Sequence, residues 1–140
     1  MKKAFLVLLI GSAIETAPSA FAADSLFDRM GGALVVAQVV DQLLDLSIAD
    51  PRTQRPFQKI NLKRLREKLN EKICALSNGP CQYTGDNMKE VHAGLGITDA
   101  EFNGLVEHLI TALDANGVGL GEKNELLKLL APMKRDVITN

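Results

Sequence analysis

The chain of 140 residues has two histidines, and one of them, His92, lies in a segment that combines apolar residues with glycines, 83–97. Met88, Val91 and His92 are spaced so that a helix would place all three side chains on one face. An imidazole held among apolar side chains can act as a single axial ligand of haem iron. It can equally be a core histidine whose hydrogen bonds are satisfied, and the spacing alone does not choose between these two interpretations.

The ends of this short helix are marked by residues typical of helix termini. Asp86 is expected to cap its start, because a carboxylate there accepts free backbone N–H groups and meets the positive end of the helix dipole. Gly94 and Gly96 are expected to end it. The segment therefore predicts a short, rigid support for one imidazole.

The two cysteines, Cys74 and Cys81, flank an Asn-Gly-Pro turn that could bring them together. An exported protein meets oxidising conditions that allow a disulfide, but sequence does not show the geometry, so bridged and free cysteines both remain open. Neither cysteine lies in a Cys-x-x-Cys-His motif, which argues against covalent haem attachment. No cysteine or serine has a histidine at a hydrolase motif spacing, so a hydrolase is poorly supported.

Residues 1–22 have the features of a signal peptide. Lys2 and Lys3 precede an apolar run at 4–14, which is too short to span a bilayer. The small-x-small sequence at 20–22 then matches a signal-peptidase site. These features predict export, most simply to the periplasm.

Cleavage is expected after Ala22, with Ala23 as the near alternative and an uncleaved membrane anchor as the other interpretation. The mature domain, 23–140, loses two of the 16 basic and one of the 17 acidic residues, which leaves a formal charge of −2. This charge gives no electrostatic support for a nucleic-acid partner. No second apolar segment is expected to reach membrane length, so no stable membrane insertion is expected after cleavage.

The apolar spacing of the mature chain predicts an all-α domain. No stretch alternates with a period of two, and no dipeptide marks a hairpin. The expected elements are a helical turn at 25–30, long helices at 33–49, 61–76 and 98–116, and a final helix at 122–133. An irregular corner at 51–61 should turn Phe57 inward.

The helices differ in how much surface they should bury. The helix at 33–49 has one narrow polar stripe, so it is expected to be buried around most of its circumference. The helix at 61–76 has a stripe of leucine and isoleucine opposite many charges, which is typical of a solvated face.

The sequence from Thr98 to Glu101 fits a capping box that opens the helix at 98–116. His108 lies on that helix beside polar residues and is expected to have a structural or surface role. The final helix is expected to bury its apolar residues, Leu126, Leu127, Leu129, Leu130 and Met133.

Seven runs distributed over the mature chain carry a family resemblance: 26–32, 49–51, 56–57, 79–80, 83–85, 88–98 and 130–133. Together, and above all through the Met-x-x-x-His-x-Gly-x-Gly-Ile run, they resemble truncated haemoglobins of group I. The resemblance implies a two-over-two α-helical sandwich, the truncated globin fold, around haem b (iron protoporphyrin IX).

The resemblance also implies roles for individual residues. His92 would be the proximal ligand of the haem iron, and Phe57 would pack on the haem face. The side chains expected to close the distal side are Leu43, Leu44, Leu65 and Leu69. The other residues expected to contact the haem are Leu62, Met88, Val91, Ile97, Phe102 and Leu126. Tyr83 and basic residues near it or on the helix at 61–76 could meet the propionates.

Two positions depart from the family pattern. Many members have tyrosine in place of Leu44 and often glutamine in place of Leu69, and both hydrogen-bond bound dioxygen. Loss of such a donor removes a bond worth ~1.5–3 kcal/mol, or roughly ten- to hundredfold in the release rate. An apolar distal side with weak O₂ retention is therefore expected, with a smaller effect on CO and NO.

Lys68 lies where some relatives supply a sixth iron ligand from the protein. A deprotonated amine in a buried position could ligate the iron. The simpler expectation is an exposed lysine that meets a propionate or water.

The resemblance favours a haem-binding globin that binds a diatomic gas (O₂, NO or CO). NO dioxygenation is possible within the family, but it needs a stable oxy form and a redox partner outside the cytoplasm, so enzyme activity stays open. The alternatives are a six-coordinate electron-transfer, haem-carrier or sensor protein, and a helical interaction module without haem.

Overall fold

The computed structural model describes residues 22–139. The predicted leader lies outside the described residues except for Ala22, so the signal peptide stays a prediction. Residues 22–139 contain helices and no β-strand, which confirms the all-α prediction.

The described residues form seven α-helices and two short 3₁₀ helices. In chain order they are α1 (Leu26–Met30), α2 (Gly32–Ala49), η1 (Arg55–Phe57), α3 (Leu62–Leu76), α4 (Met88–His92), α5 (Asp99–Ala115), α6 (Leu120–Leu130), η2 (Ala131–Met133) and α7 (Lys134–Val137). The last α-helix was not predicted. Pro132 lies in η2, where its missing N–H interrupts the α-helical bonds, and the chain then turns into α7.

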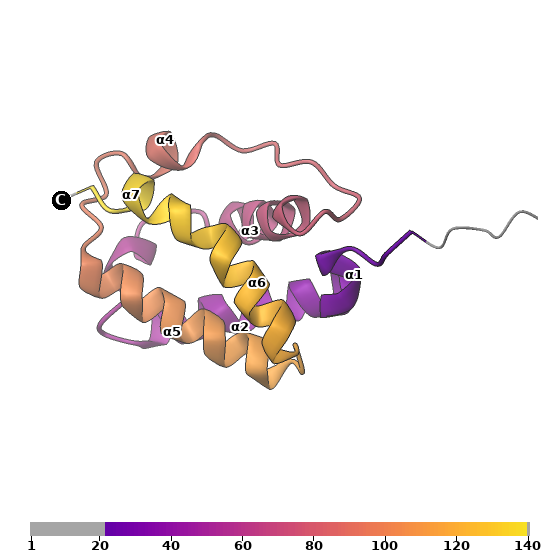
Figure 1. Cartoon of the computed structure of the whole chain (residues 1–140). Coiled ribbons are helices and arrows are strands. Elements are labelled where there is room, and N and C mark those ends of the chain that lie inside the picture. Colours follow the sequence, from indigo (N-terminus) through magenta and orange to yellow (C-terminus); the bar gives the residue numbers. More distant parts are fainter. Residues whose placement is uncertain (1–21, 140) are drawn as a thin grey trace, which may run out of the picture.

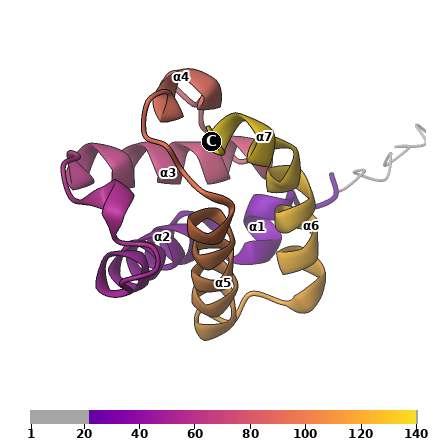
Figure 2. The same cartoon turned by 90° about the vertical axis from the view of Figure 1, so that its left-hand side faces the viewer.

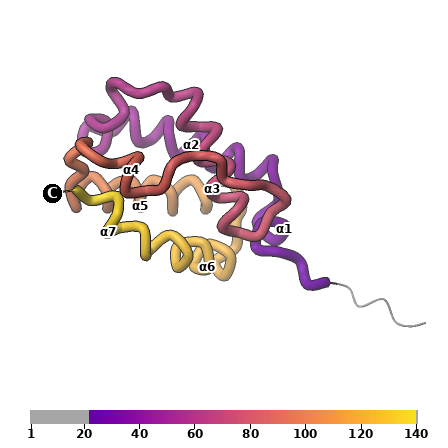
Figure 3. Tube along the Cα trace, turned by 90° about the horizontal axis from the view of Figure 1, so that it is seen from above, coloured from indigo at the N-terminus to yellow at the C-terminus, as the bar shows by residue number. Residues whose placement is uncertain are grey.

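The four longest helices are arranged as the predicted two-over-two sandwich, with α2 and α3 in one pair and α5 and α6 in the other (Figure 1). Helix α2 packs against both α3 and α5. Helix α1 lies at the opposite end of the molecule from α4 and α7, which are in contact with each other (Figure 3). The long connection at 77–87 leads from α3 to α4 (Figure 1), and a shorter one at 93–98 leads from α4 to the start of α5 (Figure 2).

Helix α2 is the centre of the hydrophobic core. Its Val40 and Leu44 are fully buried, together with Leu113 of α5. The apolar residues of its middle turns are buried or partly buried, and the polar Gln38, Asp41 and Asp45 are exposed, as predicted. Leu34 and Ile48 in its terminal turns are exposed as well. By length and composition alone this 18-residue helix is apolar enough to cross a membrane, which corrects the expectation that no such segment follows the leader. In the fold it packs between neighbouring helices.

The final helix buries less than predicted. Leu126 is fully buried, and Leu127 and Leu130 pack partly buried against the core. Leu129 is 38% exposed, because α6 contacts the rest of the fold along one face only.

Capping boxes form at the starts of α1 and α5, the second of them at the predicted position. Ser25 and Asp28 cap α1, and Thr98 and Glu101 cap α5, with side chain and backbone bonded reciprocally in each pair. These bonds satisfy N–H groups that a helix leaves free at its start, so they fix where both helices begin.

Cys74 and Cys81 are joined by a disulfide, with their Cα atoms 6.1 Å apart. The bridge links the end of α3 to the connection that leads to α4. Gly79 lies between the two cysteines, and a Cβ added there would come within 2.6 Å of Cys74 Sγ and 2.8 Å of the Phe27 ring. A side chain at this turn would therefore disturb both the bridge and the core.

His108 has the structural role that was predicted. Its Nε2 lies 3.0 Å from Asp50 Oδ2, just beyond the end of α2, and its side chain is mostly buried. Arg52 bonds the same carboxylate and also Glu107, and its hydrogen bonds lower the pKa of Asp50 to about 2. This network ties α5 to the corner that follows α2.

Replacement of Gly104 by alanine tests the contact between α5 and this corner. A Cβ there would lie 2.5 Å from Thr53 Cγ2, and Thr53 is 1% exposed and donates a hydrogen bond to the Ser47 carbonyl. We expect Gly104→Ala to lower the free energy of unfolding by about 1–2 kcal/mol, because the clash exceeds the gain in helix propensity. Urea unfolding measures this change.

Gly121→Ala in α6 is the matched control, because a Cβ there meets nothing within 4 Å. It should raise the free energy of unfolding by up to ~1 kcal/mol. Equal effects of the two substitutions would contradict the close packing at Thr53.

Candidate functional site

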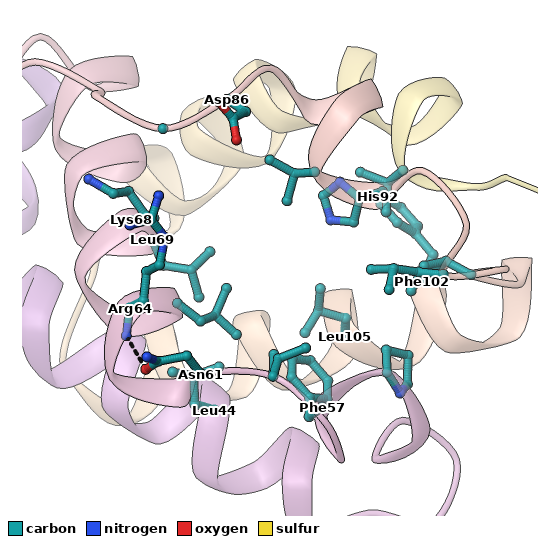
Figure 4. Close-up of a pocket in the computed structure, with 18 of the residues that line it drawn as sticks. Leu44, Phe57, Asn61, Arg64, Lys68, Leu69, Asp86, His92, Phe102 and Leu105 are labelled. Atoms are coloured by element: carbon teal, nitrogen blue, oxygen red, sulfur yellow. Dashed lines mark hydrogen bonds between the residues drawn. The ribbon is translucent and has the colours of Figure 1, made fainter.

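A cavity of about 520 Å³ opens between α2, α3, η1, α4 and α5. Its volume is in the range of small-molecule and cofactor sites, which are mostly apolar with a few polar groups. Most of its wall comes from apolar side chains, and polar and charged side chains are fewer. Figure 4 shows the labelled side chains around the open space.

His92 is the histidine that faces the cavity, and α4 positions it (Figure 4). Asn87 caps this five-residue helix by accepting the N–H of Glu90 at 2.9 Å, so the prediction that Asp86 would be the cap was wrong. The helix starts at Met88, which puts the amide of Asn87, one residue later than Asp86, next to the free N–H groups.

The hydrogen bond of His92 defines its tautomer. Its Nδ1 lies 2.7 Å from the Met88 carbonyl oxygen. A carbonyl can only accept, so Nδ1 carries the hydrogen and Nε2 of the neutral ring keeps a free lone pair. A histidine oriented in this way is prepared to bind a metal through Nε2.

The chain around His92 is supported from two directions. Leu95 N–H donates to the His92 carbonyl at 3.2 Å, and Gly94 and Gly96 adopt the positive φ angles (+76° and +58°) that turn the segment. Helix α7 packs against α4, and its Val137 is buried and lines the cavity. The C-terminal helix therefore covers the side of the site that carries His92.

The wall formed by α2, α3 and η1 is apolar. Leu43 and Leu44 are buried, and Phe57, Leu65 and Leu69 pack partly buried against them. In Figure 4, Leu44 and Phe57 lie across the space from His92. Leu44 and Leu69 therefore bring no hydrogen-bond donor to this wall, in line with the expectation of an apolar distal side.

Two cationic side chains that line the cavity, Arg64 and Lys68, lie on α3. Lys68 Nζ lies 2.9 Å from Glu71 Oε1 and donates to Thr84 Oγ1 at 2.6 Å. Lys68, followed by the Thr84 N–H, lowers the pKa of Glu71 to about 2. The amine of Lys68 is therefore held by partners outside the cavity.

Tyr83 lies in the connection between α3 and α4. Its hydroxyl donates to the Asp86 carbonyl at 2.7 Å, and burial raises its pKa above the ordinary value. The Lys72 ammonium lies 4.4 Å from the centre of its ring. These contacts fix Tyr83 at the cavity.

Most residues predicted from the sequence line this one cavity: His92, Leu43, Leu44, Phe57, Leu65, Lys68, Leu69, Tyr83, Val91, Ile97 and Phe102. Three predicted residues do not line it. Leu126 is fully buried in the hydrophobic core, Met88 contributes its carbonyl as the partner of His92, and Leu62 lies in the first turn of α3.

Other lining residues were not predicted. Leu105 lies three residues after Phe102 on the same face of α5, so helical spacing could have found it. Arg64 was not named individually, but it is one of the basic residues of the helix at 61–76 that were expected near the propionates, and it borders the cavity. No sequence signal pointed to Val137, because only the path of α7 brings it to α4.

A two-over-two helical fold around an apolar cavity that one imidazole faces defines a globin. A family model, "Bacterial-like globin", matches residues 25–139, and the chain belongs to this family.

Comparison with known proteins places the chain with group 1 truncated haemoglobins. It is 36% identical to a group 1 truncated haemoglobin of Mycolicibacterium paratuberculosis over 82% of this chain and 85% of the relative. A group 1 truncated haemoglobin of Tetrahymena thermophila is 25% identical over 81% and 94% of the two chains. The fold matches the crystal structure of a truncated haemoglobin from Tetrahymena pyriformis in the Fe(III) form, with a TM-score of 0.79, 23% identity and coverage of 84% and 100%.

The chain is therefore a haem-binding globin, and its cofactor is haem. The cavity fits this group in size and in chemistry. Its apolar walls suit the faces of a porphyrin, Arg64 and Lys68 offer cations for the porphyrin carboxylates, and His92 offers a nitrogen for iron. The cysteines are paired with each other and do not form a Cys-x-x-Cys-His motif.

The ion pair of Glu71 predicts a pH dependence of stability. Its pKa of about 2 in the folded chain is below the ordinary value of 4.5, so its contribution is present above pH 4.5 and is lost as the pH falls toward 2. We expect Glu71→Gln to lower the free energy of unfolding at about pH 6, with a smaller deficit at about pH 3. Urea titrations of both proteins at the two pH values measure this difference.

Glu67→Gln is the control, because Glu67 lies on the same helix and forms no ion pair within the described residues. If Glu71→Gln lowers the free energy of unfolding by the same amount at both pH values, the ion pair does not stabilise the fold as proposed.

Proposed function

We propose that His92 is the proximal iron ligand in this globin and that a diatomic gas binds on the opposite, apolar side. When bound, haem supplies an iron that accepts one nitrogen from the protein and leaves a position for a gas. The observation that carries the proposal is the orientation of His92, whose Nε2 is left free by the Nδ1 hydrogen bond to Met88.

The two histidines differ in a way that supports His92 as the ligand. His108 bonds Asp50 through its Nε2 and does not line the cavity. The carbonyl bond to His92 Nδ1 also makes Nε2 a stronger donor to a metal, because polarisation of the Nδ1–H bond increases the electron density of the ring.

The apolar wall supports weak retention of O₂. Leu44 and Leu69 present no hydrogen-bond donor, although both line the cavity. Bound O₂, which a hydrogen-bond donor stabilises, would dissociate faster than from a site that has such a donor. The dissociation of CO and NO would be affected less. We therefore assign gas binding as the function, and sustained NO dioxygenation would additionally need an electron donor.

The contacts of Lys68 favour an open gas site over six-coordinate iron. A lysine can ligate iron only with a free amine, and this amine bonds Glu71 and Thr84. A six-coordinate iron with Lys68 as its sixth ligand requires both contacts to break. We therefore rank the six-coordinate electron-transfer, carrier or sensor function second.

We also propose that the protein works outside the cytoplasm, as the predicted leader implies. The Cys74–Cys81 disulfide supports this location, because disulfides persist in oxidising compartments and are rare in the cytosol.

Replacement of each histidine in turn tests the proximal ligand. We expect His92→Ala to lose the ferrous five-coordinate histidine spectrum, because it removes the only imidazole that faces the cavity in the described residues. His108→Ala should keep the wild-type spectrum. Visible spectra of the ferric, ferrous and ferrous–CO forms measure both variants, and the wild-type ferrous spectrum reports whether the iron is five- or six-coordinate. Unchanged spectra for His92→Ala would contradict the assignment.

Introduction of a donor tests the distal side. We expect Leu44→Tyr to slow O₂ dissociation roughly ten- to hundredfold, because a buried hydroxyl can donate to the bound gas. Dissociation of CO should change much less. Stopped-flow measurements give both rates, and Leu44→Phe is the control that adds the ring without the hydroxyl. Equal O₂ rates for the tyrosine and phenylalanine variants would contradict an apolar distal side.

A further inference from the structure

Arg55 joins three segments that are far apart in the sequence. Its Nε and Nη2 lie 2.5 and 2.6 Å from the two carboxylate oxygens of Glu101 on α5. Its Nη1 donates to the Leu95 carbonyl at 3.1 Å, and Nη2 donates to the Gly96 carbonyl at 2.9 Å. One guanidinium thus connects η1, the segment after His92 and the start of α5.

The segment after His92 begins with an exposed turn at Ala93 and Gly94, before Leu95 and Ile97 reach the cavity. Gly94 is exposed, and a Cβ there would meet nothing within 4 Å. Local bonds from Ala93 N–H to Glu90 and from Leu95 N–H to His92 hold the segment to its own chain. Arg55 ties it to a different part of the fold through the carbonyls of Leu95 and Gly96.

These bonds place His92 two hydrogen bonds away from Arg55. The Leu95 carbonyl accepts from Arg55, and the N–H of the same residue donates to the His92 carbonyl at 3.2 Å. On the other side of Arg55, the next two residues, Pro56 and Phe57, line the cavity. Arg55 therefore lies between the wall that carries Phe57 and the chain that carries His92.

Glu101 holds the guanidinium in place. Its side chain is 11% exposed, and it also accepts the N–H of Thr98 at 3.0 Å as part of the α5 capping box. Arg55 is the main cause of the lowered pKa of Glu101. The planar fork of arginine can bond a carboxylate and two carbonyls at once, which a lysine ammonium cannot reproduce with the same geometry.

We propose that Arg55 is a positioning residue that sets the place of His92 relative to the Phe57 wall, and so the fit of the haem. This inference rests on the proposed function, because it takes His92 as the iron ligand. An ordinary exposed ion pair contributes little to stability. Arg55 differs from such a pair because it also bonds the carbonyls of Leu95 and Gly96.

The experiment compares Arg55→Ala and Arg55→Lys with Arg52→Ala. Arg52 is the matched control, because it lies in the same corner and bonds a carboxylate of α5, Glu107, but does not bond the segment after His92. Three quantities are measured: the rate of haem transfer to excess apomyoglobin, the iron–histidine stretching band of the ferrous protein by resonance Raman, and hydrogen exchange in the haem-free protein.

We expect Arg55→Ala to speed haem transfer roughly tenfold, as expected for the loss of charge-assisted hydrogen bonds, and to shift or broaden the iron–histidine band. Hydrogen exchange should rise mainly at residues 93–97. Arg55→Lys should resemble Arg55→Ala, because the fork is lost although the charge remains. Arg52→Ala should leave haem transfer within about twofold of wild type.

Two results would overturn the proposal. The first is that Arg55→Ala matches Arg52→Ala in all three measurements. The second is that exchange rises evenly over the helices, which would make Arg55 a general stabilising residue. If His92 proves not to be the ligand, the histidine band is absent from wild type, while exchange at residues 93–97 still reports whether Arg55 holds the segment.

Discussion

The hydrogen bond from His92 Nδ1 to the Met88 carbonyl is the contact on which the proposed site depends. A neutral imidazole has one lone pair for a metal, and this bond leaves that lone pair on Nε2. Helix α4 has only five residues, too few to be stable alone. Its geometry must therefore come from its neighbours: the Asn87 cap, the contact with α7, and the bonds from Arg55 to the chain that follows it.

The cavity combines apolar walls with a few charged side chains, and two of these have ion-pair partners. Burial of an unpaired charge is costly, and the half-buried Lys68 and Glu101 are paired with Glu71 and Arg55, respectively. The same pairing keeps the Lys68 amine from the interior. Leu44 and Leu69 provide no hydrogen-bond donor for a bound gas. The proposed gas binding therefore depends on two features: the apolar side chains of the wall and the ion pair that holds the Lys68 amine.

The disulfide and the C-terminal helix support this arrangement from two sides. The Cys74–Cys81 bridge fixes the start of the long connection that carries Tyr83 and leads to α4. Helix α7 covers α4 from the other side and brings Val137 to the cavity. The bridge is anchored on α3 and α7 lies outside the four-helix sandwich, and both hold the chain that presents His92.

The sequence by itself determined the helices, their apolar faces and His92, because these depend on local spacing and on family motifs. It also predicted Leu43, Leu44, Leu65 and Leu69, which share one wall of the cavity. Only the tertiary structure decided the cap at Asn87, the cysteine pairing, the place of Leu126 in the core and the contacts of Lys68 and Arg55. These depend on atoms from distant segments meeting at hydrogen-bond or packing distance, and helical periodicity carries no information about which segments meet.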